Sequence, residues 1–181
     1  MSDRRFTLFD TALGRCGVAW SDRGLTRVAL PDADDDALRA RLGPGIEHPP
    51  PPEVAAAIAQ ITAHVGGQDG ALATIRLDMT DVPAFYREVY AAARAIPSGQ
   101  TVSYGALATL TGKPGGARAI GQAMGKNPFP IVVPCHRVLA ARQATGGFSA
   151  YGGVATKAKL LAAEGFTLAT QPDLPFGTRR S

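Results

Sequence analysis

The spacing of apolar residues changes near Pro83, and this change limits the folds that are open to the chain. Before it, residues 5–31 contain short strand-like runs broken at glycine, residues 53–67 show helical spacing, and residues 72–79 are again strand-like. After it, helical spacing predominates. We therefore expect an α/β domain with a small antiparallel sheet over residues 1–82, followed by a mainly α domain.

Glycine, aspartate and proline mark the connections of the first part. Gly24 separates the runs 16–20 and 25–30, which we expect to pair as a hairpin. The acidic segment 32–36 is typical of a loop. The four prolines at 49–52 indicate an extended connector that leads into the helix.

Two short helices follow a longer one in the second part. Residues 83–96 are predicted to form a helix that begins at Pro83, because proline is well accommodated in a first helical turn. Ser103 can cap a helix that ends near Gly112, and residues 117–127 form the second short helix. Because a glycine-containing turn joins these two helices, we expect a helix-turn-helix motif.

Charge is distributed unevenly between the two parts. The 181-residue chain has a net charge of +4, but residues 1–82 carry 8 basic and 12 acidic residues, whereas residues 83–181 carry 11 basic and 3 acidic residues. A basic half favours a polyanionic partner such as nucleic acid. The alternative is a solvated face that is rich in arginine.

Targeting signals and cysteine usage indicate the compartment. No apolar run reaches the ~20 residues of a membrane-spanning helix, and the N-terminus lacks the apolar core of a secretory signal, so we expect an intracellular, cytoplasmic protein. In such proteins distant cysteines, here Cys16 and Cys135, are usually free. No CxxC pair is present and the three histidines are scattered, so we expect no zinc site. Cys16 lies in a strand-like run and is predicted to be a core residue.

The second short helix consists mainly of alanine and glycine, and its long polar side chains are Arg118, Gln122 and Lys126. The second helix of a helix-turn-helix meets nucleic acid through its N-terminal residues. Few of its side chains could make bidentate base contacts. We therefore expect close approach to the nucleic acid with little reading of its sequence, and Arg118 reaching into the base stack. The alternative is a tightly packed helix pair in which small residues allow close contact.

The apolar segment IVVPCHRVLA, residues 131–140, places a thiol beside an imidazole and a guanidinium. A thiol reacts as the thiolate, and burial raises its pKa above the free value of about 8.5. Cys135 therefore needs a base, which His136 could supply through a tight turn or a bridging water. Glu164 is the acid that could orient His136, and Arg137 is expected to bind backbone carbonyls. The alternative is a core cysteine beside a partly buried histidine.

The wider sequence around Cys135 resembles the O6-alkylguanine-DNA alkyltransferases, also called methylated-DNA–protein-cysteine methyltransferases. PCHRV is preceded by NPFPIVV and followed by GGFSAYGGVATKAKLLAAEG, and FYREV, SYGALA and ARAIGQAM occur upstream in the family order. The match covers about residues 83–166. The resemblance implies a ribonuclease H-like support domain over residues 1–82, a winged-helix (helix-turn-helix) DNA-binding domain over residues 83–170, and a tail, 171–181.

The resemblance implies direct DNA repair in a single turnover, without a cofactor or metal. Cys135 would take the alkyl group from O6-alkylguanine, and also from O4-alkylthymine, and keep it. His136 would act as the base through a water molecule, and Glu164 would orient it. Tyr104 would crowd a phosphate and help to rotate the nucleotide out of the stack, and Arg118 would fill the gap.

The resemblance also implies which residues shape the pocket. Asn127 would pin the turn between the second short helix and the cysteine segment. Met124, Pro130, Val138 and Tyr151 would line the pocket for the flipped base. The partner would be duplex DNA, bound by a monomer from the minor groove with weak sequence preference.

The loop before the paired glycines departs from the family pattern. Where the family usually carries a tyrosine, this chain has Ala150, and Tyr151 follows it. Phe148 or Tyr151 is expected to cover the base instead. The ligands that hold zinc in the N-terminal domain of some relatives have no counterparts here, whereas the acceptor position holds Cys135.

Two other functions fit parts of the sequence. A non-transferring lesion-binding or regulatory DNA-binding protein could use the same helix-turn-helix and would leave the alkyl group on the DNA. A Cys-His hydrolase would need an oxyanion site and turnover on esters or amides. The reactive cysteine argues against the first, and the basic, alanine-rich helix argues against the second.

Overall fold

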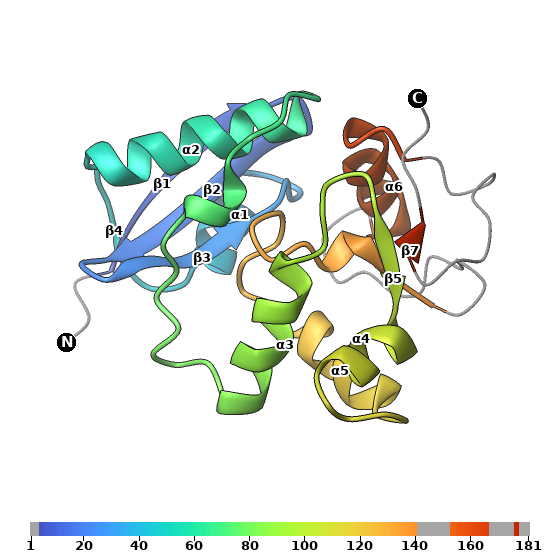
Figure 1. Cartoon of the computed structure of the whole chain (residues 1–181). Helices are drawn as coiled ribbons and strands as arrows, with labels where there is room; N and C mark the ends of the chain where they lie inside the picture. Colours follow the sequence, from blue (N-terminus) through green and yellow to red (C-terminus); the bar gives the residue numbers. More distant parts are fainter. Residues whose placement is uncertain (1–3, 141–152, 167–175, 178–181) are drawn as a thin grey trace.

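The first part of the chain forms a sheet that is covered by helices on both faces. The computed structural model describes residues 4–140, 153–166 and 176–177 (Figure 1). The elements of the first part are β1 (Arg5–Thr11), β2 (Gly14–Ser21), β3 (Gly24–Ala29), α1 (Asp35–Leu42), β4 (Ile46–Glu47), α2 (Pro52–Val65) and the 3₁₀ turn η1 (Leu72–Thr74).

The sheet has four strands in the order β3-β2-β1-β4. β1 pairs with β2 and β2 pairs with β3 in antiparallel register, which confirms the predicted hairpin. The expectation of a purely antiparallel sheet is wrong at one edge, because β4 pairs with β1 in parallel. A helix lies between β3 and β4, and such a crossover lets the chain return beside β1 in the same direction.

Alternate residues of β2 face opposite sides of the sheet, and each side is covered by one helix. Trp20 belongs to the main core, to which α2 contributes Ile61. Ala19 belongs to a smaller cluster with Leu38 of α1. Figure 1 shows α2 lying across the strands, and its end at the cap residue Gly66 confirms the predicted helix and its stop.

The prediction of a strand over residues 72–79 is wrong in the first half of the segment and holds only around Leu77. The structure has η1 at the start of this segment, followed by an extended piece that pairs with β3 through a bridge between Leu25 and Leu77. Arg94 of the following helix donates from Nη2 to three carbonyls of the segment, at 3.0 to 3.2 Å. These carbonyls are therefore satisfied by a distant side chain rather than by a neighbouring strand.

The acidic segment 32–36 is only in part a loop. Asp34 caps α1, since its side chain accepts a hydrogen bond from the Ala37 amide at 2.8 Å. Asp35 and Asp36 lie in the first turn, where negative charge interacts favourably with the helix N-terminus. The repeated aspartates thus begin a helix that the sequence reading missed.

The second part is mainly helical and contains a small sheet. Among the described residues, no helix combines the length and apolarity that crossing a membrane requires. The small sheet has the strand order β6-β5-β7. The elements are α3 (Ala84–Arg94), β5 (Thr101–Ser103), α4 (Tyr104–Leu110), α5 (Ala117–Gly125), the 3₁₀ turn η2 (Cys135–Arg137), β6 (Val138–Leu139), α6 (Gly153–Ala163) and β7 (Phe176–Gly177).

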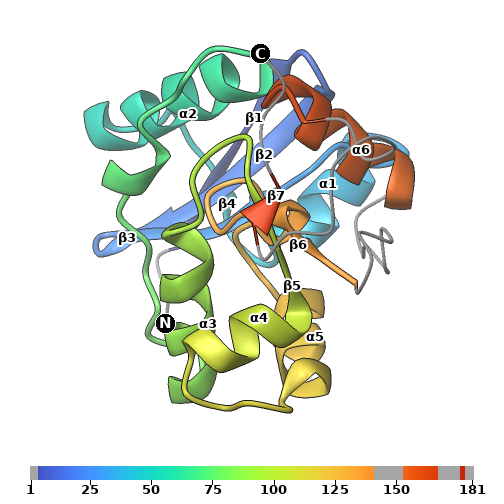
Figure 2. The same ribbon diagram turned by 45° about the vertical axis from the view of Figure 1, so that its right-hand side comes forward.

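The predicted helix-turn-helix is present as α4 and α5, which pack against each other (Figure 2). Ser103 caps α4, and its hydroxyl accepts a hydrogen bond from the Ala106 amide at 3.0 Å. Ile120 and Ala123 of α5 are fully buried. The pair is therefore fixed by a local cap and by an apolar face turned to the core.

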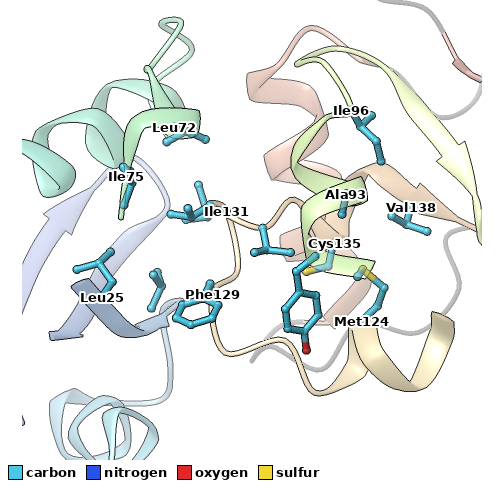
Figure 3. Close-up of a cluster of buried hydrophobic side chains, with 14 of the residues drawn as sticks. Leu25, Leu72, Ile75, Ala93, Ile96, Met124, Phe129, Ile131, Cys135 and Val138 are labelled. Atoms are coloured by element: carbon cyan, nitrogen blue, oxygen red, sulfur yellow. The ribbon is translucent and has the colours of Figure 1, made fainter. Parts of the chain in front are cut away.

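One apolar core runs through both parts of the chain. Leu25 and Ile75 from the first part share a cluster with Phe129 from the second, as Figure 3 shows. The Val28 amide of β3 also donates to the Pro128 carbonyl at 2.8 Å. The segment that leads to Cys135 is thus held by the sheet of the first part.

The cap of α4 predicts the effect of a substitution at Ser103. Ser103→Ala removes the acceptor for the Ala106 amide, and we expect the free energy of unfolding to fall by about 1 kcal/mol. Ser103→Thr keeps the hydroxyl and should retain most of this stability. Urea denaturation followed by circular dichroism measures both, and equal stability of the alanine variant and the wild type would contradict a capping role.

Candidate active site

Cys135 begins the 3₁₀ turn η2 rather than lying in an extended strand. In an extended chain, Cys135 and His136 would point to opposite faces. A tight turn is one of the two arrangements, with a bridging water, that would allow His136 to accept a proton from Cys135. The segment therefore departs from the strand-like appearance of its apolar sequence.

Asn127 fixes the segment between α5 and η2. Its Nδ2 donates to the Val133 carbonyl at 2.9 Å, and its Oδ1 accepts from the Phe129 amide at 2.9 Å. The same segment holds Ile131 at a φ of 76°, which a β-branched residue rarely adopts. Asn127 thus lies at the turn for which the sequence singled it out.

Cys135 lies in the apolar core and keeps 8% of its surface exposed. Met124, Ala93 and Val138 belong to the same cluster and are drawn around it in Figure 3. Of the residues predicted to line the pocket, Met124 and Val138 are buried and Pro130 is partly buried. The remaining ones, Tyr151 with its neighbours Phe148 and Ala150, lie outside the described residues.

The thiol of Cys135 is held in its protonated form. Burial raises its pKa, and the hydrogen bond with Asn127, the charge of Lys157 and the backbone amides of Cys135 and His136 oppose this rise without cancelling it. A thiol reacts as the thiolate. Cys135 therefore needs a base at the moment of reaction.

The ring of His136 is held in place by Glu164, which follows the last residue of α6. Nε2 of His136 lies 2.7 Å from Oε1 of Glu164, and both residues are buried. An ionised carboxylate only accepts hydrogen bonds, so Nε2 carries the proton and Nδ1 is the basic nitrogen. This Nδ1 is buried and has no hydrogen-bond partner in the part of the chain that the structure describes. The structure thus brings together Cys135, His136 and Glu164.

Glu164 is also bound by groups that the sequence reading did not assign to it. Arg137 donates to both carboxylate oxygens, from Nε to Oε2 at 2.9 Å and from Nη2 to Oε1 at 2.7 Å. Nε2 of His64 lies 2.8 Å from Oε1, and the Gly99 amide donates to Oε2 at 3.4 Å. Arg137 donates from Nη1 to the Ile96 carbonyl at 2.6 Å, which confirms the expectation that it binds a backbone carbonyl.

These contacts determine the charges in the cluster. Burial acts to raise the pKa of Glu164, but His136, His64 and Arg137 outweigh it and hold this pKa well below its usual range. Burial lowers the pKa of His136, Glu164 raises it, and Arg137 and His64 lower it further. The net direction is downward, so the His136 ring is neutral at rest and able to accept a proton.

Lys157 of α6 is a buried cation beside this cluster. It is fully buried, and its Nζ donates to the Val138 carbonyl at 2.9 Å. Burial lowers the pKa of Lys157 to about 8, against the attraction of Cys135. Since a positive charge near Cys135 favours the thiolate, Lys157 assists ionisation of the thiol.

The sequence reading missed His64 and Lys157, although both carry a signal. His64 lies three residues after Ile61 on the buried stripe of α2, and Lys157 lies three residues before Leu160 on that of α6. A polar side chain on a buried stripe needs a buried partner. This pattern indicates both residues, but it does not identify their partners.

The residues predicted to bind DNA lie at the exposed side of the helix-turn-helix. Arg118, Gln122 and Lys126 recur every four residues, and all three are exposed. Tyr104 begins α4 and is half-buried. The structure thus places Arg118 and Gln122 one turn apart on α5, Lys126 at the residue that caps its end, and Tyr104 on the neighbouring helix.

The small residues of α5 lie on two sides of the helix. Ala123 is buried against the core, as the helix-packing alternative expects. A Cβ added at Gly121 or Gly125 would meet no atom within 4 Å, so these glycines face open space rather than a packed helix. The exposed side of α5 can therefore be approached closely by a large ligand.

The chain is similar to several known proteins. A family model described as "6-O-methylguanine DNA methyltransferase, DNA binding domain" matches residues 84–166. The chain is 40% identical over 164 residues to the regulatory protein ada of Salmonella typhimurium, across 88% of this chain but only 45% of that protein. It is 37% identical over 155 residues to the methylated-DNA–protein-cysteine methyltransferase of Mycolicibacterium paratuberculosis, across 86% and 88% of the two chains.

The fold is also similar to that of a solved structure. The crystal structure of Mycobacterium tuberculosis OGT in complex with DNA matches with a TM-score of 0.72 at 30% identity. The match covers 88% of this chain and 92% of that chain. The likeness therefore extends over both parts of the chain, with their mixed sheets and helices.

The charge balance around Glu164 predicts the effect of removing its charge. Glu164→Gln leaves Arg137 as an uncompensated buried cation, and breaking a buried pair on one side costs about 3–5 kcal/mol. We expect a loss of this size in the free energy of unfolding at neutral pH. Glu88→Gln, at an exposed position of α3, is the matched control and should change stability little.

This loss should depend on pH. The folded-state pKa of Glu164 lies below its unfolded value of about 4.3, so its contribution is complete above that value and is lost as the pH falls through the acid range. The stability difference between the wild type and Glu164→Gln should therefore shrink on acidification. Urea denaturation at a series of pH values measures it, and a difference that is constant or grows would contradict this account.

Proposed function

Because the chain belongs to the methylated-DNA–protein-cysteine methyltransferase family, we propose that it repairs DNA by transferring one alkyl group from O6-alkylguanine to its own Cys135. The main support is the geometry at His136, which follows Cys135 in the same turn: its Nε2 lies 2.7 Å from Oε1 of Glu164, and its Nδ1 remains the basic nitrogen. The alkyl group stays on the sulfur, so each molecule acts once.

The proposed reaction is a displacement at the alkyl carbon. Nδ1 of His136 takes the thiol proton through one water, and the sulfur forms a bond to the alkyl carbon. The carbon–O6 bond breaks, its electron pair moves to the guanine, and the guanine takes up one proton from water, which is balanced by the proton that His136 afterwards releases to water. A thiol and an alkylguanine thus become a thioether and guanine, with no net oxidation. Glu164 stabilises the charge that His136 acquires during this step.

The proposed partner is duplex DNA, approached by α5 from the minor groove. Arg118 and Gln122 of this helix and Lys126 at its cap are exposed, and Gly121 leaves room for the nucleic acid to come close. Tyr104 crowds a phosphate and Arg118 fills the gap that the flipped nucleotide leaves. Phosphate contacts then dominate the affinity, which falls as the salt concentration rises.

The pocket and the division into domains are proposed on the same basis as the transfer reaction. Met124, Pro130 and Val138 line the space for the flipped base, and Asn127 pins the turn that carries it. Residues 1–82 form a ribonuclease H-like support domain, residues 83–170 a winged-helix alkyltransferase domain, and residues 171–181 a tail. The sheet sandwiched between α1 and α2 supports the first assignment, and the strands β5, β6 and β7 beside α4 and α5 support the second.

The transfer itself is tested by mass spectrometry. Incubation with an oligonucleotide that carries O6-methylguanine should add one methyl group per protein molecule, on the peptide that contains Cys135. Cys135→Ala should gain no mass. Cys16→Ala should gain the full mass, because Cys16 is fully buried in β2 and burial raises its pKa to about 11.

Two outcomes would contradict the transfer. A lesion-binding protein without transfer would bind the oligonucleotide and leave the protein mass unchanged. A hydrolase would turn over ester or amide substrates many times without retaining a methyl group.

The role of Arg118 predicts a difference between two substrates. Arg118 offsets part of the free-energy cost of taking the nucleotide out of the base stack. Arg118→Ala should therefore slow transfer from duplex DNA by about tenfold, which corresponds to ~1.4 kcal/mol. Transfer from the free O6-methylguanine nucleoside should be unchanged, because the side chain acts on the stack and not on the chemistry. Single-turnover rates with both substrates measure this.

Lys126, at the other end of α5, provides the control for Arg118. Lys126→Ala should weaken DNA binding and reduce its salt dependence, but saturating DNA should restore the wild-type transfer rate. An equal loss of rate with nucleoside and duplex for Arg118→Ala would contradict the assigned role.

A further inference from the structure

His64 reaches the candidate active site from the other part of the chain. It lies near the end of α2, 100 residues before Glu164, and its Nε2 is 2.8 Å from Oε1 of that carboxylate. The side chain is only 4% exposed and that of Glu164 is 1% exposed. This contact therefore lies in a buried, low-dielectric environment, where a hydrogen bond to a charged group is strong.

His64 and His136 contact the same oxygen atom. Oε1 of Glu164 lies 2.7 Å from Nε2 of His136 and 2.7 Å from Nη2 of Arg137, in addition to His64. Because an ionised carboxylate only accepts hydrogen bonds, Nε2 of His64 must carry a proton and donate it.

The other ring nitrogen of His64 does not take part in the cluster. Its Nδ1 is buried and has no hydrogen-bond partner among the residues that the structure describes. His64 therefore contacts the cluster through Nε2, which lies 2.8 Å from Oε1 of Glu164.

The hydrogen bond from His64 to Oε1 weakens the hydrogen bond that Glu164 accepts from His136. Each hydrogen bond to a carboxylate stabilises its negative charge and makes it a weaker acceptor for the others. A weaker acceptor holds the His136 imidazolium less firmly. Loss of the His64 donor should consequently raise the affinity of His136 for a proton.

We propose that His64 is a positioning residue of the transfer reaction, which donates a hydrogen bond to Glu164 and thereby keeps His136 neutral and able to accept the proton of Cys135. This inference rests on the proposed function of the site. It gives the first part of the chain a role in the chemistry in addition to support.

Besides His64, other charged and titratable groups act on the site, and they are the same in every variant compared below. Those that act on His136 are Arg137 of η2 and Glu164 after α6. The groups that act on or are affected by Cys135 are Lys157 of α6, Tyr90 of α3 and Tyr104 of α4. A shift that follows the donor at position 64 therefore belongs to that donor.

The experiment is the pH dependence of single-turnover methyl transfer from an O6-methylguanine oligonucleotide. His64→Phe fills the space without a donor, whereas His64→Gln can place an amide N–H near the position of Nε2. The rate falls in acid when His136 is protonated before the reaction. We expect this acid limb to move to higher pH by about one unit in His64→Phe, and to stay at the wild-type position in His64→Gln.

The outcomes separate this inference from the proposed function. If the wild type transfers no methyl group, the proposed function fails. If the wild type transfers it and the acid limb is unmoved in His64→Phe, or moves equally in both variants, the role of His64 is wrong while transfer stands.

A measurement on the wild type covers the case in which His64→Phe does not fold. Nitrogen-15 NMR of the three histidine rings should show a proton on Nε2 of His64. A proton on Nδ1 with a bare Nε2 would overturn the inference.

Discussion

The buried carboxylate of Glu164 is the group on which the candidate site depends. The Glu164 side chain is 1% exposed, and an isolated charge at such a position would be strongly unfavourable. Arg137 balances the charge, and His136, His64 and the Gly99 amide complete the hydrogen bonds. The same contacts that make the charge tolerable also set the orientation and the proton position of His136. Stability and reactivity therefore depend on one cluster.

The groups around Glu164 come from distant segments of the chain. Arg137 and His136 lie on η2, Gly99 precedes β5, and His64 lies on α2. The shared apolar core brings these segments together, and the β3 contact at Pro128 holds the turn that leads to the cysteine. The family match over residues 84–166 does not include His64, so part of the environment of the site lies outside the segment that carries the family signature.

Local patterns in the sequence predicted most of the fold. The strands broken at glycine, the helix ending at Gly66 and the Ser103 cap are all present, because each depends on nearby residues. The predicted strand at 72–79 forms only around the Leu77 bridge, whereas Arg94, distant in sequence, satisfies the carbonyls of Leu72, Ala73 and Ile75. The helix at Asp35–Leu42 was missed because its capping aspartates are also typical of a loop.

The part of the candidate site that lies in one short motif could be predicted from the sequence. Cys135 and His136 are adjacent, and Glu164 is the one acidic residue between Glu88 and Asp173, so these could be named without a structure. His64 could not be linked to them, because a contact across 100 residues leaves no local pattern. Nor did the sequence indicate that Arg137 binds the same carboxylate.

The central claim is that His136 is the base for Cys135, and His136→Gln tests it most directly. Glutamine can still donate to Glu164 but has no basic nitrogen, so the buried cluster keeps its hydrogen bond and loses only proton transfer. A general base contributes roughly 10²–10⁴-fold to a rate, so the account predicts a fall of at least about 100-fold in single-turnover methyl transfer at neutral pH, with DNA affinity unchanged. A transfer rate in His136→Gln equal to that of the wild type would contradict the account.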